Sequence, residues 1–189
     1  LTGLASRKTF DKHLFELLGK AASDEMLNGP ESRRRGTPGS NHWLAVCDID
    51  HFKQVNDNFG HLIGDEVLIV LAQEMRQSFR FDDQLFRFGG EEFIALLQPT
   101  DEQVAVATLE RFRTNVEKQI FSRVGHITVS IGFSALMPND TPTDVIDRAD
   151  EALYFAKRHG RNRVDCYEKL VASGDVAAKE IAKGEVELF

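Results

Sequence analysis

Two short acidic clusters in this chain have residue types and positions suited to binding a metal ion. The first is Asp48-Ile49-Asp50, which ends an apolar run at residues 43–47. Alternate side chains of a strand share a face, so Asp48 and Asp50 should point one way and Ile49 the other. Carboxylates at the end of a buried strand are costly unless a cation or hydrogen-bond donors compensate their charge.

The second cluster, Glu91-Glu92, directly follows Gly89-Gly90 between two β-rich segments. If this hairpin neighbours the first strand, the acids converge, and two carboxylates about 4 Å apart at an effective dielectric of about 20 repel by about 4 kcal/mol. Such repulsion corresponds to about three pKa units. A divalent cation relieves it, and Mg²⁺ is the usual ion where phosphates share the coordination sphere. A charged hairpin tip with helix-capping aspartates explains the same residues, and spacing alone leaves both interpretations open.

The composition is that of one globular domain. The chain has 189 residues, 42% of them hydrophobic, which suffices for one substantial core. Its formal net charge of −7 argues against general DNA or RNA binding. Cys47 and Cys166 have no metal-ligand spacing and indicate a reducing, cytoplasmic location. No run is long enough to span a membrane and no signal peptide is visible. Because the chain opens at Leu1 without a methionine, we expect a fragment whose upstream part could carry a sensor or membrane anchor.

Hydrophobic spacing predicts strands and helices that alternate along the chain. Strands are predicted over 43–49, 84–88, 92–97, 126–135 and 163–167, and helices after Ser6, over 64–79, over 101–119 and from Thr143 to Gly160. Residues 21–41 are predicted to be a loop, in which the arginines at 33–35 either contact phosphate or are solvated. Gly89-Gly90 predicts a tight hairpin turn with positive φ. We therefore expect an α/β fold with one central mixed β-sheet flanked by helices.

Residues 87–93, RFGGEEF, resemble the signature of the GGDEF family of diguanylate cyclases, in its glutamate variant. The resemblance continues through LTGL at 1–4, DIDHFKQVND at 48–57, FGHLIGDEVL at 59–68, SIGFS at 130–134 and RADEALYFAKRHGRNRV at 148–164. It implies a palm-like, nucleotide-cyclase-like fold with the GGEEF β-hairpin at the active site. The domain would span residues 1–167, followed by a C-terminal tail at 168–189 that is a candidate helix. Ser6 and Lys8 replace the family's usual asparagine and arginine near the domain entrance.

The resemblance also implies roles for the acidic clusters. Asp48 and Glu91 match the family's catalytic, metal-binding carboxylates, with the Ile49 carbonyl and Glu92 assisting. Two Mg²⁺ ions per active site are implied, with Mn²⁺ as the other candidate ion. Such ions activate the 3′-hydroxyl of one GTP and stabilise charge on the α-phosphate of another. Glu91 is the residue expected to help deprotonate that hydroxyl.

Asn56 and Asp65 match the family's guanine-recognition pair. Asparagine offers a donor and an acceptor, and aspartate accepts from a ring N–H and an exocyclic amine that adenine does not offer together. Taken alone, a turn residue and a helix-start acid fit these positions equally well. The positions that contact the triphosphate are matched by Phe52, Lys53, Lys157 and Arg161. Phe52 and Lys53 are expected in a loop after the first strand, where backbone amides can bind phosphate oxygens. Taken alone, Lys157 and Arg161 also fit charges that cap a helix C-terminus. His51 and His61 match no ligand position and are expected to be structural or exposed.

Arg80 and Asp83 match the family's inhibitory RxxD motif at its usual offset before GGEEF. Arginine can bind a guanine edge or a phosphate, and aspartate can accept from guanine N–H groups. A surface ion pair would have the same sequence pattern. Arg111, in the following predicted helix, is the expected second arginine, and the implied regulation is feedback inhibition by cyclic di-GMP.

These matches imply a diguanylate cyclase, a nucleotidyltransferase that condenses two GTP into cyclic di-GMP and two pyrophosphates. One protomer with one GTP provides only half of the cyclic product, because each GTP must attack the α-phosphate of the other. A cytoplasmic homodimer with antiparallel active sites is therefore expected to be the active species. One alternative is a catalytically silent module that binds GTP or cyclic di-GMP, which in the family usually accompanies a degenerate motif. The other is a palm-like module using ATP, which Asn56 and Asp65 disfavour.

Overall fold

A six-stranded mixed sheet forms the centre of the computed structural model, which describes residues 1–28 and 41–178 and, in the first segment, side chains only up to residue 20. The strands are β1 (Ala5–Ser6), β2 (Asn41–Ile49), β3 (Gln84–Arg87), β4 (Glu92–Thr100), β5 (Val129–Ala135) and β6 (Val164–Cys166). Their order across the sheet is β1-β3-β4-β2-β5-β6. β2 runs antiparallel to both β4 and β5, whereas β1–β3 and β5–β6 are parallel pairs. The prediction of a mixed α/β sheet is confirmed.

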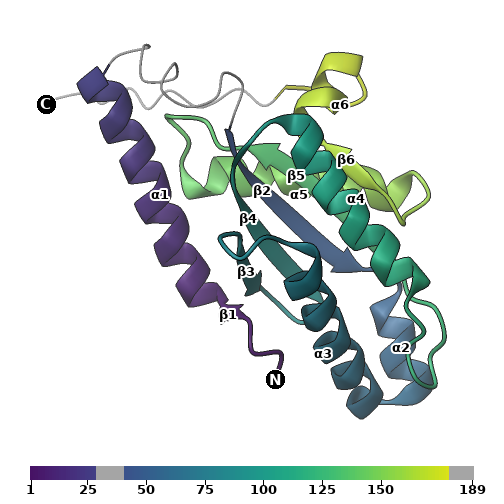
Figure 1. The fold of residues 1–189 in the computed structure, drawn as a ribbon. Coiled ribbons are helices and arrows are strands. Elements are labelled where there is room, and N and C mark those ends of the chain that lie inside the picture. The colour runs from purple at the N-terminus through teal and green to yellow at the C-terminus, as the bar shows by residue number, and fades with distance from the viewer. Residues whose placement is uncertain (29–40, 179–189) are drawn as a thin grey trace, which may run out of the picture.

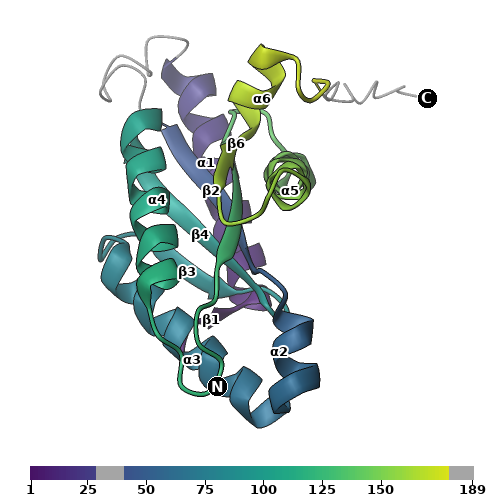
Figure 2. The same cartoon turned by 90° about the vertical axis from the view of Figure 1, so that its right-hand side faces the viewer.

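Helices cover both faces of this sheet (Figures 1 and 2). They are α1 (Arg7–Asn28), α2 (Phe52–Phe59), α3 (His61–Ser78), α4 (Glu102–Lys118), α5 (Pro142–Arg158) and α6 (Tyr167–Ser173). α3 and α4 pack on one face, and α1 and α5 pack on the other. In β2, Ala45 and Cys47 pack into the first core, whereas Leu44 and Val46 pack into the second. A strand buried on both faces has no polar alternation, which is why residues 43–47 read as continuous apolar sequence.

Strand register places the two acidic clusters side by side. Asp48 of β2 pairs with Glu92 of β4, and on its other side with Ser130 of β5. The predicted hairpin between β3 and β4 is present, but neither Gly89 nor Gly90 has the expected positive φ. A Cβ at Gly89 would lie 2.7 Å from Glu92 Oε2, so a larger residue there would require the Glu92 carboxylate to move.

Two predicted loops are helical in the structure. α1 continues to Asn28, since residues 21–28 contain neither glycine nor proline to stop it. The rest of that predicted loop, with the arginines at 33–35, lies outside the described residues. Phe52 and Lys53 begin α2 rather than forming a loop, and this short helix buries only Phe52 and Val55, too few for a clear periodic signal.

Helix ends also differ from the sequence-based expectation. α3 begins at His61, three residues before the predicted start. α5 is capped by Thr141 rather than Thr143, because Asp144 and Thr141 form a reciprocal capping box and Pro142 fits the first turn. α6 begins at Tyr167, the residue at which the sequence predicts the domain to end. That domain boundary remains a prediction. Within the described residues, no helix has the length and apolar character needed to cross a membrane.

Candidate metal and nucleotide site

Asp48 is the centre of the acidic cluster and has one cationic partner. Its side chain is only 7% exposed, and Lys157 Nζ, from the last turn of α5, lies 2.9 Å from Asp48 Oδ1. Burial raises the pKa of Asp48, the hydrogen bond and charge of Lys157 lower it, and the charges of Glu92 and Asp50 raise it again. The net direction is upward, so a single lysine compensates this carboxylate only in part.

Glu91 adds a second carboxylate next to Asp48. Burial raises the pKa of Glu91, and the negative charge of Asp48 raises it further. Among the described residues, no three carboxylate, imidazole or thiol side chains are already arranged around one point. Mg²⁺ at nucleotide sites commonly takes one or two carboxylates and completes its shell with phosphate oxygens and water. The oxygen ligands and the uncompensated charge at Asp48 and Glu91 therefore fit a divalent cation that arrives with a nucleotide.

Asp50 is compensated by hydrogen-bond donors, one of the two possibilities that the sequence leaves open for the strand-end aspartates. Its carboxylate accepts hydrogen bonds from Thr128 Oγ1 at 2.6 Å, Ser130 Oγ at 2.7 Å and the Asn162 backbone N–H at 3.1 Å. Asp50 is thus buried and satisfied by donors rather than by a cation. Ile49 points to the opposite face, as predicted, and packs into the core under α3 and α4.

The predicted guanine-binding pair lies where α2 and α3 meet. Asn56 is in α2 and Asp65 is in the first half of α3, and both are half-buried. The side chain of Asn56 lies against Gly64, where an added Cβ would be only 2.1 Å from Asn56 Oδ1. Asn56 therefore contacts the residue directly before Asp65. Gly64, which the sequence assigned only to a helix start, therefore lies beside the predicted guanine-binding pair.

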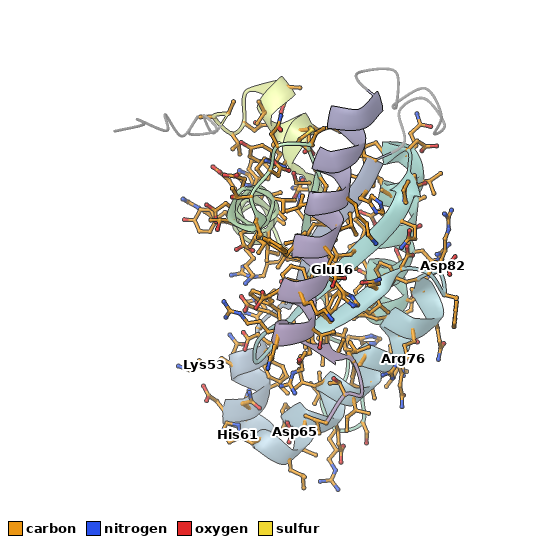
Figure 3. All side chains as sticks on the ribbon, turned by 90° about the vertical axis from the view of Figure 1, so that its left-hand side faces the viewer. Glu16, Lys53, His61, Asp65, Arg76 and Asp82 are labelled. Atoms are coloured by element: carbon orange, nitrogen blue, oxygen red, sulfur yellow. The ribbon has the colours of Figure 1, made fainter. Side chains whose placement is uncertain are left out.

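The residues predicted to contact phosphate come from two helix ends. Phe52 is buried and Lys53 is exposed in the first turn of α2, whose N–H groups have no acceptor within the helix. Figure 3 shows Lys53 extending outward from α2 at the same end of the molecule as Asp65. Lys157 is at the C-terminal end of α5, and Arg161 lies exposed just beyond it.

The two histidines near this site are exposed, as predicted. His51 adopts a left-handed conformation with φ 59° at the start of α2. His61 begins α3 and is visible at the surface in Figure 3. Neither is placed with the acidic cluster.

The predicted inhibitory residues form a separate group. Asp83 accepts hydrogen bonds at 2.9 Å from the backbone N–H groups of Arg80 and Gln98, so its carboxylate holds the turn together. Arg80 and Arg111 are exposed, and Arg111 donates to the carbonyl oxygen of Ser78. In Figure 3, Asp82 of this turn lies on the opposite side of the view from Lys53. The turn is therefore distinct from the acidic site.

The mixed sheet, with a hairpin that carries acids to the end of a buried central strand, defines a palm fold of the nucleotidyl-cyclase type. The chain matches the family model described as "Diguanylate cyclase, GGDEF domain" over residues 1–163. The chain therefore belongs to the GGDEF family.

Individual relatives agree with this assignment. Diguanylate cyclase DgcP of Pseudomonas aeruginosa is 41% identical over 172 residues, which cover 84% of this chain and 26% of the relative. Diguanylate cyclase DgcM of Escherichia coli is 39% identical over 168 residues, covering 82% of this chain and 41% of the relative. The chain thus spans less than half the length of these curated relatives. The GGDEF domain of DgcB from Caulobacter crescentus, solved in complex with c-di-GMP, superposes with a TM-score of 0.74 at 36% identity, covering 88% of this chain and 93% of that one.

Proposed function

We propose that this domain is a diguanylate cyclase that converts two GTP molecules into cyclic di-GMP and two pyrophosphates. The observation that carries the proposal is the pairing of Asp48 with Glu92 across β2 and β4, which brings buried negative charge to one end of the sheet. The α2–α3 junction with Asn56 and Asp65 supplies polar groups suited to guanine. Relatives named diguanylate cyclases over most of this chain support the same activity.

The acidic cluster would hold two divalent cations, which supply positive charge that acidifies the 3′-hydroxyl and stabilises the α-phosphate. Asp48 and Glu91 would bind them, helped by Glu92 and the Ile49 carbonyl. Glu91 would also accept the proton of the 3′-hydroxyl. A bond then forms between that 3′-oxygen and the α-phosphorus of the other GTP, the bond from the α-phosphorus to the bridging oxygen breaks, and pyrophosphate leaves.

Substrate binding would divide between the two ends of GTP. Asn56 and Asp65 would hydrogen-bond the guanine edge, which gives discrimination against adenine. Lys157 and Arg161 would bind the triphosphate as cations, together with Lys53 and the N-terminal N–H groups of α2 at Phe52 and Lys53. Ring closure needs two such half-sites facing each other, so the active species would be a homodimer.

Product would bind at the turn that contains Arg80. Arg80 and Arg111 supply exposed guanidinium groups, while Asp83 keeps the turn in shape through its two backbone hydrogen bonds. The structure of the relative DgcB with c-di-GMP supports product binding by domains of this family. Replacing Arg80 with alanine should weaken both product affinity and feedback inhibition, and unchanged values would place the inhibitory site elsewhere.

Turnover of purified domain with Mg²⁺ and either GTP or ATP, followed by nucleotide chromatography, tests the activity. Cyclic dinucleotide should form from GTP alone, and the rate per molecule should rise with protein concentration because assembly is required. Asp48→Asn and Glu91→Gln should abolish formation of the cyclic dinucleotide. Arg158→Met removes an exposed charge next to Lys157 and should leave this activity in place. A chain that binds cyclic di-GMP but never turns over GTP would instead be a silent receptor, and product from ATP would indicate a different cyclase.

A further inference from the structure

The turn after α5 has an unusual backbone. Gly160, Arg161 and Asn162 follow one another with φ values of 109°, 60° and 46°. Glycine adopts such angles at no cost and asparagine tolerates them, but arginine does so uncommonly. A left-handed run of this kind persists only where surrounding contacts hold it.

Asn162 makes such contacts through its backbone N–H and through both polar atoms of its side chain. Its backbone N–H donates to Asp50 Oδ2 at 3.1 Å. Its side-chain Nδ2 donates to Glu117 Oε1 at 2.7 Å, and its Oδ1 accepts from Arg113 Nη1 at 2.7 Å. The turn is therefore tied to the end of β2 on one side and to α4 on the other.

The three partners of Asn162 are themselves held by other contacts. Asp50 is fixed by Thr128 and Ser130 of the adjacent chain segment, as described above. Arg113 is fixed by ion pairs to Glu110 at 2.8 Å and to Glu117 at 2.9 Å. Asn162 thus contacts groups that other hydrogen bonds and ion pairs already hold in place.

Arg161 lies between two fixed points. On one side, Lys157 reaches Asp48, and on the other side Asn162 reaches Asp50, two residues further along the same strand end. The backbone N–H of Arg161 donates to Ala156 O at 3.0 Å, so its main chain is held as well. The Arg161 side chain is exposed, and its main chain is held beside the end of β2 by contacts of its neighbours Lys157 and Asn162.

We propose that Asn162 is a positioning residue, which holds the left-handed turn so that Arg161 meets the triphosphate at the acidic site. This inference rests on the proposed function, in which Arg161 contacts phosphate. Asn162 itself touches no nucleotide, and its effect passes through Arg161. It should therefore influence binding of phosphate and leave binding of the guanine base unchanged.

Binding of a GTP analogue with a methylene group between the α- and β-phosphates, compared with binding of guanosine, separates these effects. Asn162→Gly keeps the backbone donor to Asp50 and tolerates positive φ, but it loses both bonds to α4. We expect it to weaken binding of the analogue about tenfold, as the loss of an ordered charge-assisted contact would, and to leave guanosine binding unchanged. Arg161→Met should weaken binding of the analogue at least as much, and the double variant should be no weaker than Arg161→Met alone.

Glu117→Ala provides a second variant if Asn162→Gly folds poorly. It removes the acceptor of Asn162 Nδ2 and one ion pair of Arg113, but it keeps the Arg113 donor to Asn162 Oδ1. We expect Glu117→Ala to lower affinity for the GTP analogue less than Asn162→Gly does and to leave affinity for guanosine unchanged. Glu102→Ala is the matched control, because it removes an acidic side chain from the same helix, the partner of Lys169 at 2.6 Å, without touching Asn162 or Arg113. Additive losses in the double variant, or equal losses for guanosine, would overturn the positioning role. If Arg161→Met leaves binding of the analogue unchanged, the phosphate contact of the proposed function fails, and this inference fails with it.

Discussion

Lys157 Nζ lies 2.9 Å from Asp48 Oδ1, and the two side chains differ greatly in exposure, 35% for the lysine and 7% for the aspartate. The aspartate is enclosed by the sheet, whereas the lysine reaches it from the end of α5 and keeps access to solvent. This lysine therefore supplies positive charge where the proposed mechanism requires a divalent cation. A metal ion bound to Asp48 would lie close to the positive charge of Lys157 and be repelled by it, so the two cations compete for this carboxylate.

Removing the lysine should accordingly strengthen metal binding in the absence of nucleotide. We expect Lys157→Met to raise the affinity for Mn²⁺ about tenfold, equivalent to about 1.4 kcal/mol, while lowering the affinity for GTP. Titration followed by electron paramagnetic resonance of free Mn²⁺ measures the first effect directly. Arg158→Met, which removes the same charge from the neighbouring position, should leave Mn²⁺ affinity nearly unchanged. Equal or weaker Mn²⁺ binding by Lys157→Met would contradict the competition.

The raised pKa of Glu91 predicts how stability depends on pH. A carboxyl group whose pKa is raised by folding stabilises the fold fully below its unfolded pKa, near the ordinary value of 4.5, and loses that contribution as pH rises through the folded value. In metal-free protein, Glu91→Gln should therefore raise Tm at neutral pH, and the gain should disappear below pH 4.5. Thermal denaturation in the presence of a chelator, from neutral pH to below pH 4.5, measures this change in Tm. Glu66→Gln, at an exposed position on α3, is the control. A neutral-pH Tm below that of the unmodified protein would refute the assigned repulsion.

Gly64→Ala should separate stability from nucleotide recognition. The new methyl group would lie 2.1 Å from Asn56 Oδ1, so the Asn56 carboxamide must turn away. Because alanine is preferred over glycine inside helices by about 1 kcal/mol, the free energy of unfolding should not fall greatly. GTP affinity should fall about tenfold and the preference for GTP over ATP should narrow, as for a lost hydrogen-bonding partner.

Gly19→Ala is the matched control for this substitution. It lies inside α1 with nothing within 4 Å of the added Cβ, so it gains helix propensity without touching the nucleotide site. Both nucleotide affinities should stay unchanged in this variant. Unaltered GTP affinity in Gly64→Ala would show that Asn56 is not a guanine ligand.

Arg148 should be important for folding rather than for catalysis. Its side chain is 10% exposed and pairs with the fully buried carboxylate of Asp140 at 2.6 Å, while also donating to Ser134 Oγ and Ala135 O. Arg148→Met leaves Asp140 charged and unpaired, which should cost about 3–5 kcal/mol in the free energy of unfolding. Urea denaturation measures this loss. Adding Asp140→Asn to Arg148→Met should restore part of the lost free energy of unfolding. A loss under about 1 kcal/mol in Arg148→Met would mean that the ion pair is not structurally important.

Local sequence was sufficient for those features that depend on neighbours along the chain. The apolar run at residues 43–47 predicted β2, and the apolar segments around Gly89-Gly90 predicted the β3–β4 hairpin, because buried strands need continuous apolar side chains. The alternation that sends Ile49 away from Asp48 follows from strand geometry alone. Local signals misled where two capping residues competed, as at Thr141 and Thr143, and where short α2 buried too few residues to be seen.

The amino-acid sequence by itself determined the order of the longer strands and helices, the two acidic clusters and the family to which the chain belongs. Only the tertiary structure decided which acids share a site. Asp48 meets Glu92 and Lys157, whereas Asp50 is satisfied by Thr128, Ser130 and Asn162, up to 112 positions away. The physical reason is that the partners of a buried carboxylate are set by strand register and helix packing between distant segments. No pattern within a few residues of Asp48 or Asp50 contains that information.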